Sequence, residues 1–146
     1  MLNESIITID IDWAPDFVIA KVLNYLIENE VKATWFITHD SPEIRRLSNY
    51  PDLFEVGLHP NFNEESTQGD SPRTVMAYLK HIVPSAISVR THELLQSSSL
   101  LKMMREEFEI LNDVSLFVPN TTNLVPHRLF VAKNLSLLRF PYFWED

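Results

Sequence analysis

Short apolar runs alternate along the chain with stretches in which apolar residues recur every three or four positions. The first run, residues 6–11, is rich in β-branched residues and apolar on both faces, as in a buried parallel strand. A helical stripe follows from about Pro15, and the alternation then repeats. Further strands are predicted at 31–38, 53–58 and 86–90, and further helices from Ser41, from Ser71 and over 97–108. This order predicts an α/β fold with a mostly parallel sheet and alternating helices.

The pattern is weaker after residue 108. A short fifth strand is predicted at 109–112, and the apolar runs at 116–118, 129–131 and 137–140 could be strands whose pairing is not readable. The aromatic stretch 140–144 is predicted to pack in the core or at its rim rather than to serve as a platform for sugars. A length of 146 residues fits one domain, residues 1–146.

Composition and charge narrow the class of function. The chain has a net charge of −8 and no cysteine, which disfavours nucleic acid as a partner and excludes disulfides and thiolate ligands. No apolar run approaches the ~20 residues of a membrane helix, and residues 1–5 show no signal-peptide pattern. The prediction is a cytoplasmic protein that does not span a membrane.

Two carboxylates stand at the end of the first predicted strand. Asp10 and Asp12 are two residues apart and point the same way if the chain stays extended. Such close carboxylates repel each other unless a cation lies between them. The pair therefore suits one metal ligand and one base, although Asp12 could instead cap a helix.

Other polar residues follow the third and fourth predicted strands. His59 is a candidate metal ligand, and the carboxamide oxygen of Asn63 could be a weak further one. Arg90 can hold a carboxylate in its ionised form. His92 is the only candidate on this rim for a general acid. Carboxyl ends of parallel strands meet at one edge, where ligands bind in such folds, so these groups are expected to converge there.

The ordered set of motifs resembles the polysaccharide deacetylase (NodB-homology) superfamily. The matching segments are 8–12 (TIDID), 31–37 (VKATWFI), 55–59 (EVGLH) and 89–90 (VR). Segments 57–62 (GLHPNF), 89–92 (VRTH) and 139–146 (RFPYFWED) resemble a sub-group that includes proteins linked to surface-polysaccharide biosynthesis.

The resemblance implies an irregular (β/α) barrel that removes acetyl groups from N-acetylated sugars with zinc or another divalent ion. It implies that Asp10 is the base, oriented by Arg90, and that Asp12 and His59 are metal ligands. The second histidine of the family's His-x-x-x-His motif falls on Asn63. Trp13 and Asn61, beside these motifs, are predicted to bind the carbohydrate substrate.

The family's late catalytic histidine has no counterpart before Asp146, so the last barrel strands are expected to be missing as well. A sheet edge left open in this way could be covered by a homodimer. Two alternatives to an active deacetylase remain. One is a degenerate deacetylase-like domain that binds a glycan or a partner protein, and the other is a haloacid-dehalogenase-like phosphatase, which also carries Asp-x-Asp after its first strand.

Overall fold

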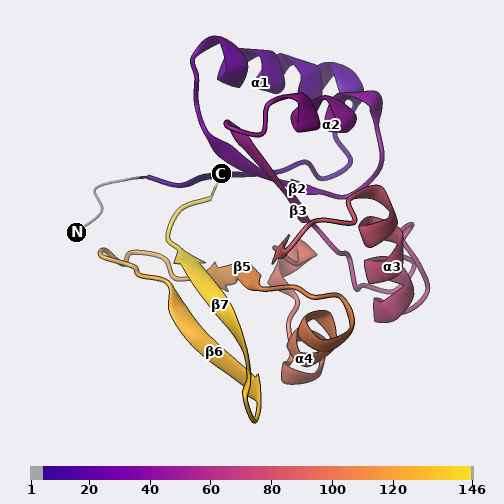
Figure 1. The fold of residues 1–146 in the computed structure, drawn as a ribbon, viewed down its shortest axis with the longest axis vertical. Coiled ribbons are helices and arrows are strands. Elements are labelled where there is room, and N and C mark those ends of the chain that lie inside the picture. The colour runs from indigo at the N-terminus through magenta and orange to yellow at the C-terminus, as the bar shows by residue number, and fades with distance from the viewer. Residues whose placement is uncertain (1–4, 146) are drawn as a thin grey trace.

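Seven strands form one open sheet in the part of the chain that the structure, a computed structural model, describes: residues 5–145 (Figure 1). The strands are β1 (Ile7–Asp10), β2 (Ala33–Ile37), β3 (Phe54–Leu58), β4 (Ser88–Val89), β5 (Asn112–Phe117), β6 (His127–Ala132) and β7 (Leu135–Tyr142). Their order is β1-β2-β3-β4-β5-β7-β6, and every neighbouring pair is parallel except β6 with β7. The predicted α/β fold with a mostly parallel sheet is confirmed. Among the described residues the sheet does not close into a barrel.

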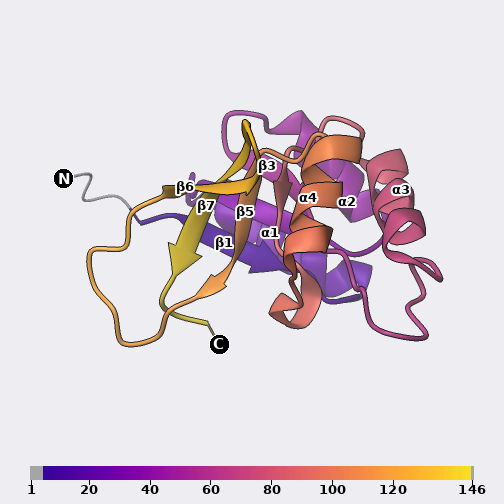
Figure 2. The ribbon, with the colours of Figure 1, turned by 90° about the horizontal axis from the view of Figure 1, so that it is seen from below.

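Helices connect the parallel strands and supply one side of the core. They are α1 (Asp16–Glu28), α2 (Pro42–Arg46), α3 (Pro72–Ile82) and α4 (Ser98–Glu107), with 3-10 turns η1 (Leu47–Asn49) and η2 (His92–Leu94). Figures 1 and 2 show α1 and α2 beside the first strands and α4 beside the last ones. Leu23 of α1, Met76 of α3 and Met104 of α4 are fully buried. Burying each such side chain stabilises the fold by roughly 1.5–3 kcal/mol.

Serine caps determine where three of the helices begin. The side chains of Ser41, Ser71 and Ser97 each accept a hydrogen bond from a backbone N–H in the first turn of α2, α3 and α4, respectively. A free N–H at a helix start needs such an acceptor. Proline is tolerated at the next position, where α2 and α3 have it, because no N–H is needed there. The predicted helix starts therefore follow from local sequence alone.

The structure corrects three expectations. The strand predicted at 109–112 begins instead at Asn112 and runs to Phe117, because Glu109 has a left-handed backbone (φ 57°) that an extended strand does not allow. The first strand is an edge strand rather than a buried one, and Ile6 before it is 71% exposed. Phe143 and Trp144, expected to pack, are 62% and 72% exposed.

The sheet curves so strongly that its two ends approach each other at the carboxyl ends of the strands. Arg90, which follows β4, reaches across the curve to Thr8 and Asp10 of β1 and lies under the ring of Tyr142 of β7. This one side chain therefore joins strands from both halves of the sheet.

Over the described residues, the structure contains no helix with the length and apolar character needed to cross a bilayer. Met1 to Glu4, on which most of the signal-peptide prediction depended, lie outside the described residues.

Candidate metal and catalytic site

Three loops at the carboxyl ends of β1, β3 and β4 bring the predicted polar residues together. Asp10 ends β1 and Asp12 lies in the loop that follows it, His59 comes from the second loop, and Arg90 and His92 come from the third. Parallel pairing of β1 with β2, β2 with β3 and β3 with β4 places these loops at the same edge of the sheet.

Asp12, His59 and His92 form a compact triangle of possible ligand atoms. Asp12 Oδ1 lies 3.2 Å from His59 Nε2 and 3.2 Å from His92 Nδ1, and the two ring nitrogens are 3.4 Å apart. Two ligand atoms at about 2.0–2.1 Å from a tetrahedral zinc ion lie about 3.3 Å from each other. The donor set and its spacing therefore fit a divalent ion such as zinc.

The surroundings of the triangle favour metal binding. His59 Nδ1 lies 2.7 Å from the carbonyl oxygen of Arg90, so the proton on that nitrogen leaves Nε2 free to face the triangle. Such a hydrogen bond is the usual way in which a protein fixes the tautomer of a metal-binding histidine. In the absence of an ion, the neighbouring imidazoles lower the pKa of Asp12, chiefly through hydrogen bonding with His59, although partial burial opposes the shift. Asp12 is therefore held in its ionised form.

Asp10 lies beside the triangle and is paired with Arg90. Arg90 Nη1 donates to both carboxylate oxygens, at 3.1 and 3.3 Å, while Nη2 donates to Thr8 Oγ1. The guanidinium is almost fully buried between the rings of Phe36 and Tyr142, at 5.0 and 4.4 Å from their centroids. These contacts fix the position and orientation of the Asp10 carboxylate.

Both loops that carry Asp12 and His92 contain left-handed backbone. Asp12 and Trp13 have left-handed φ angles of 36° and 58°, and Glu93 and Leu94 have φ angles of 53° and 54°. Residues other than glycine rarely adopt this region, and such positions cluster at functional sites. The turn at Asp12 directs its carboxylate toward the two histidines.

A buried glutamine holds the loop that follows His59. Gln68 donates to the carbonyl oxygens of Thr38 and His59, and its own oxygen accepts from the backbone N–H of Asn61. These three bonds attach the loop to the ends of β2 and β3. The side chain of Gln68 is therefore fully used in positioning the His59 segment.

Besides Asp10 and Arg90, three more predicted site residues lie outside the triangle. Asn63 donates from Nδ2 to Glu93, at 2.9 Å, and Asn61 uses its side-chain oxygen to accept from the backbone of Asn63. Trp13 packs edge-on against His92, with ring centroids 5.3 Å apart. The structure thus places His92, predicted as an acid, where Asn63 was expected, because η2 brings the imidazole back over His59.

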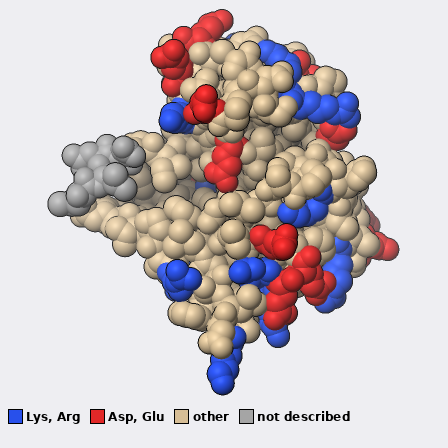
Figure 3. All heavy atoms as spheres, viewed as in Figure 1, with Lys and Arg blue, Asp and Glu red and all other residues tan. Residues whose placement is uncertain are grey.

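A hollow of about 290 Å³ opens above these groups. It is lined by the triangle, by Asp10, and by residues that the sequence did not single out: Thr91, Glu93, Leu94, Tyr142 and Glu145. Tyr142 donates to Glu145 at 2.8 Å. Partial burial is the larger cause, and this hydrogen bond the smaller one, of the raised pKa of the tyrosine. In the space-filling view the surface is hollowed between the part formed by α1 and α2 and the part formed by the last strands, and an acidic side chain lies there (Figure 3).

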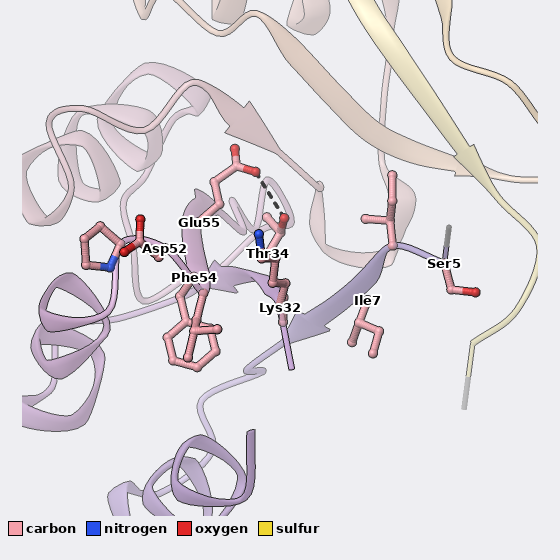
Figure 4. Close-up of a pocket in the computed structure, with 11 residues that line it drawn as sticks. Ser5, Ile7, Lys32, Thr34, Asp52, Phe54 and Glu55 are labelled. Atoms are coloured by element: carbon pink, nitrogen blue, oxygen red, sulfur yellow. Dashed lines mark hydrogen bonds between the residues drawn. The ribbon is translucent and has the colours of Figure 1, made fainter. Parts of the chain in front are cut away.

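A larger hollow of about 360 Å³ lies at the opposite, amino ends of β1, β2 and β3 (Figure 4). There Glu55 accepts a hydrogen bond from the hydroxyl of Thr34, at 3.1 Å. None of its described lining residues is a histidine, and they bring no set of ligand atoms together. The smaller hollow is therefore the candidate site, because it contains the possible metal ligands and the larger one does not.

The model of the WbmS-like polysaccharide deacetylase family matches residues 7–146, and the chain belongs to this family. The predicted resemblance to polysaccharide deacetylases is thereby confirmed, and it supports a deacetylase-type domain rather than the haloacid-dehalogenase-like alternative. No curated protein matches the chain.

A crystal structure from Bordetella bronchiseptica is similar over almost the whole chain. That protein is described provisionally as a polysaccharide deacetylase involved in O-antigen biosynthesis. The identity is 34% and the TM-score 0.84, and the match covers 97% of this chain and 58% of the other. The chain thus spans somewhat more than half the length of this relative.

Proposed function

We propose that this chain is a metal-dependent deacetylase domain that hydrolyses the N-acetyl amide of a sugar in a polysaccharide or its precursor. The observation that carries the proposal is the triangle of Asp12, His59 and His92, whose spacing of 3.2–3.4 Å suits one tetrahedral ion. Catalytic zinc sites typically use three protein ligands and keep one position open. The third ligand is His92, not Asn63.

A divalent ion held there would supply an activated water and polarise the amide carbonyl. Asp10 is placed beside it to accept the proton of the attacking water, as a general base must. Arg90 orients the Asp10 carboxylate through its contacts at 3.1 and 3.3 Å. Trp13 packs edge-on against His92. Together with Asn61 on the neighbouring loop, it is proposed to contact the sugar.

Zinc titration of two variants tests which carboxylate binds the metal and which acts as the base. Asp12→Ala is expected to weaken binding by about 100-fold or more, since loss of even an outer-shell partner costs 10–100-fold. Asp10→Asn removes a base and not a ligand, so binding should change by only a few-fold, measured by calorimetry. Equal losses would mean that the two roles are wrongly assigned.

Acetate release from N-acetylglucosamine oligomers tests the activity itself. With His59 and His92 both in the triangle, no further histidine lines the hollow among the described residues to act as a general acid, and a general acid contributes typically ~10²–10⁴-fold. We expect slow release that disappears with a chelator and returns with zinc or cobalt. Metal binding without any release would instead support the degenerate, glycan-binding alternative.

The family and its named relative also bear on the substrate and on assembly. A role in surface-polysaccharide biosynthesis is proposed here from the description of the Bordetella protein, which says only that it is involved in O-antigen biosynthesis. A cytoplasmic location and a homodimer across an open sheet edge remain proposals; β1 and β6 are the two edges of the sheet in the described part of the chain.

A further inference from the structure

The loop that carries His92 is attached to β5 at both of its ends. At its start, the backbone N–H of Thr91 donates to Ser115 Oγ at 2.9 Å. At its end, Gln96 Nε2 donates to the carbonyl oxygen of Ser115 at 2.7 Å. One serine on β5 therefore holds both ends of the segment in which His92 lies.

The segment between these attachments needs outside support. Glu93 and Leu94 follow His92 directly, and both have left-handed φ angles near 54° without being glycine. An unsupported loop would relax from this conformation, since L side chains disfavour it. Because η2 directs the imidazole toward His59, relaxation would move His92 Nδ1 away from the triangle.

Ser115 is in turn held by a buried ion pair. Its backbone N–H donates to Asp113 Oδ1 at 3.1 Å, and Arg139 Nε donates to the other oxygen of Asp113 at 2.6 Å. Arg139 Nη2 also donates to Gln96 Oε1 at 2.6 Å. Asp113 and Ser115 are fully buried, so these bonds are shielded from water. The contacts close a ring that joins β5, β7 and the His92 loop.

We propose that Ser115 is a positioning residue for His92, and that the Asp113–Arg139 pair keeps Ser115 and Gln96 in place for this role. The inference rests on the proposed function, because His92 matters in this way only as a metal ligand. None of the four supporting residues, Ser115, Asp113, Arg139 and Gln96, lines the hollow above the triangle. Their effect reaches the site through the Thr91 N–H and the Gln96 amide.

Cobalt(II) titration of Ser115→Ala, followed by the visible absorption of the bound ion, tests the inference. The hydroxyl is lost while the backbone bond to Asp113 stays, and we expect the affinity to fall by about 10–100-fold, as for other outer-shell partners. Gln96→Leu, which removes the second attachment, should weaken binding in the same way. Leu137→Ala is the matched control: it opens a cavity in β7 beside Arg139 and lowers stability, but cobalt affinity should stay within about twofold.

The metal-free protein provides a second readout. The ring of His92 packs against Trp13 at 5.3 Å, so its NMR signals report the position of the imidazole. Ser115→Ala should shift these signals and speed exchange of the Thr91 amide, whereas Leu137→Ala should do neither. If the unmodified chain bound no cobalt, the metal-site proposal would fail. The NMR signals of His92 would still show whether Ser115 positions the imidazole. Unchanged His92 signals in Ser115→Ala would overturn the inference.

Discussion

His92→Ala is expected to abolish tight binding of zinc or cobalt, with a loss of affinity of about 100-fold or more. The imidazole supplies one of the three ligand atoms, and removing a ligand must cost at least the 10–100-fold that loss of an outer-shell partner costs. Calorimetric titration at constant pH measures the change. His59→Ala should behave in the same way, because its Nε2 lies 3.2 Å from Asp12 and 3.4 Å from His92.

Asn63→Ala is the control that separates the two assignments of the third ligand. In the structure Asn63 donates to Glu93, so its loss should change metal affinity by no more than about threefold, within the range of a surface hydrogen bond. A large loss in Asn63→Ala, with His92→Ala unaffected, would restore the assignment that the family motif suggested.

Asp113→Leu is expected to lower the free energy of unfolding by about 3–5 kcal/mol, because it leaves the charge of the buried Arg139 guanidinium without its carboxylate partner. Asp113 is fully buried and Arg139 nearly so. Urea unfolding followed by circular dichroism measures the change. Replacing both members, as Asp113→Leu with Arg139→Met, should recover much of the loss, since no charge is then left buried.

Arg73→Ala provides the comparison for an exposed pair. Arg73 makes two hydrogen bonds to Glu107, at 2.8 and 2.7 Å, on the surface between α3 and α4. Solvent screens such a pair, so its loss should lower the free energy of unfolding far less than Asp113→Leu does. Equal costs for Asp113→Leu and Arg73→Ala would show that burial of the Asp113 pair has no special effect.

Much of the fold could be predicted because its signals are local. The serine caps at Ser41 and Ser71 and the apolar stripe of α1 need only neighbouring residues to be recognised. The first four strands lie within a few residues of their predicted bounds, since buried parallel strands are short apolar runs between polar loops.

The last three strands were harder to predict because polar residues interrupt them. Asp113 and Ser115 lie inside β5 and are buried, which the composition of a strand does not suggest. Their burial is tolerated because Arg139 donates a hydrogen bond to Asp113 and the Thr91 N–H donates one to Ser115. Both donors come from other parts of the chain. Likewise, the antiparallel pairing of β6 with β7 depends on the hairpin turn, where Asn134 has a φ of 64°.

The sequence by itself determined the α/β class, the strand ends at Asp10, His59 and Arg90, and hence the edge of the sheet at which the chemistry lies. Those conclusions need only local patterns and the rule that parallel strands end together. Only the tertiary structure decided which side chains complete the site. Asp12 and His92 reach His59 because their loops turn through left-handed residues and because β5 and β7 hold the second loop. Contacts between distant segments determine where the side chains of Asp12 and His92 point, so their directions could not be predicted from spacing along the chain.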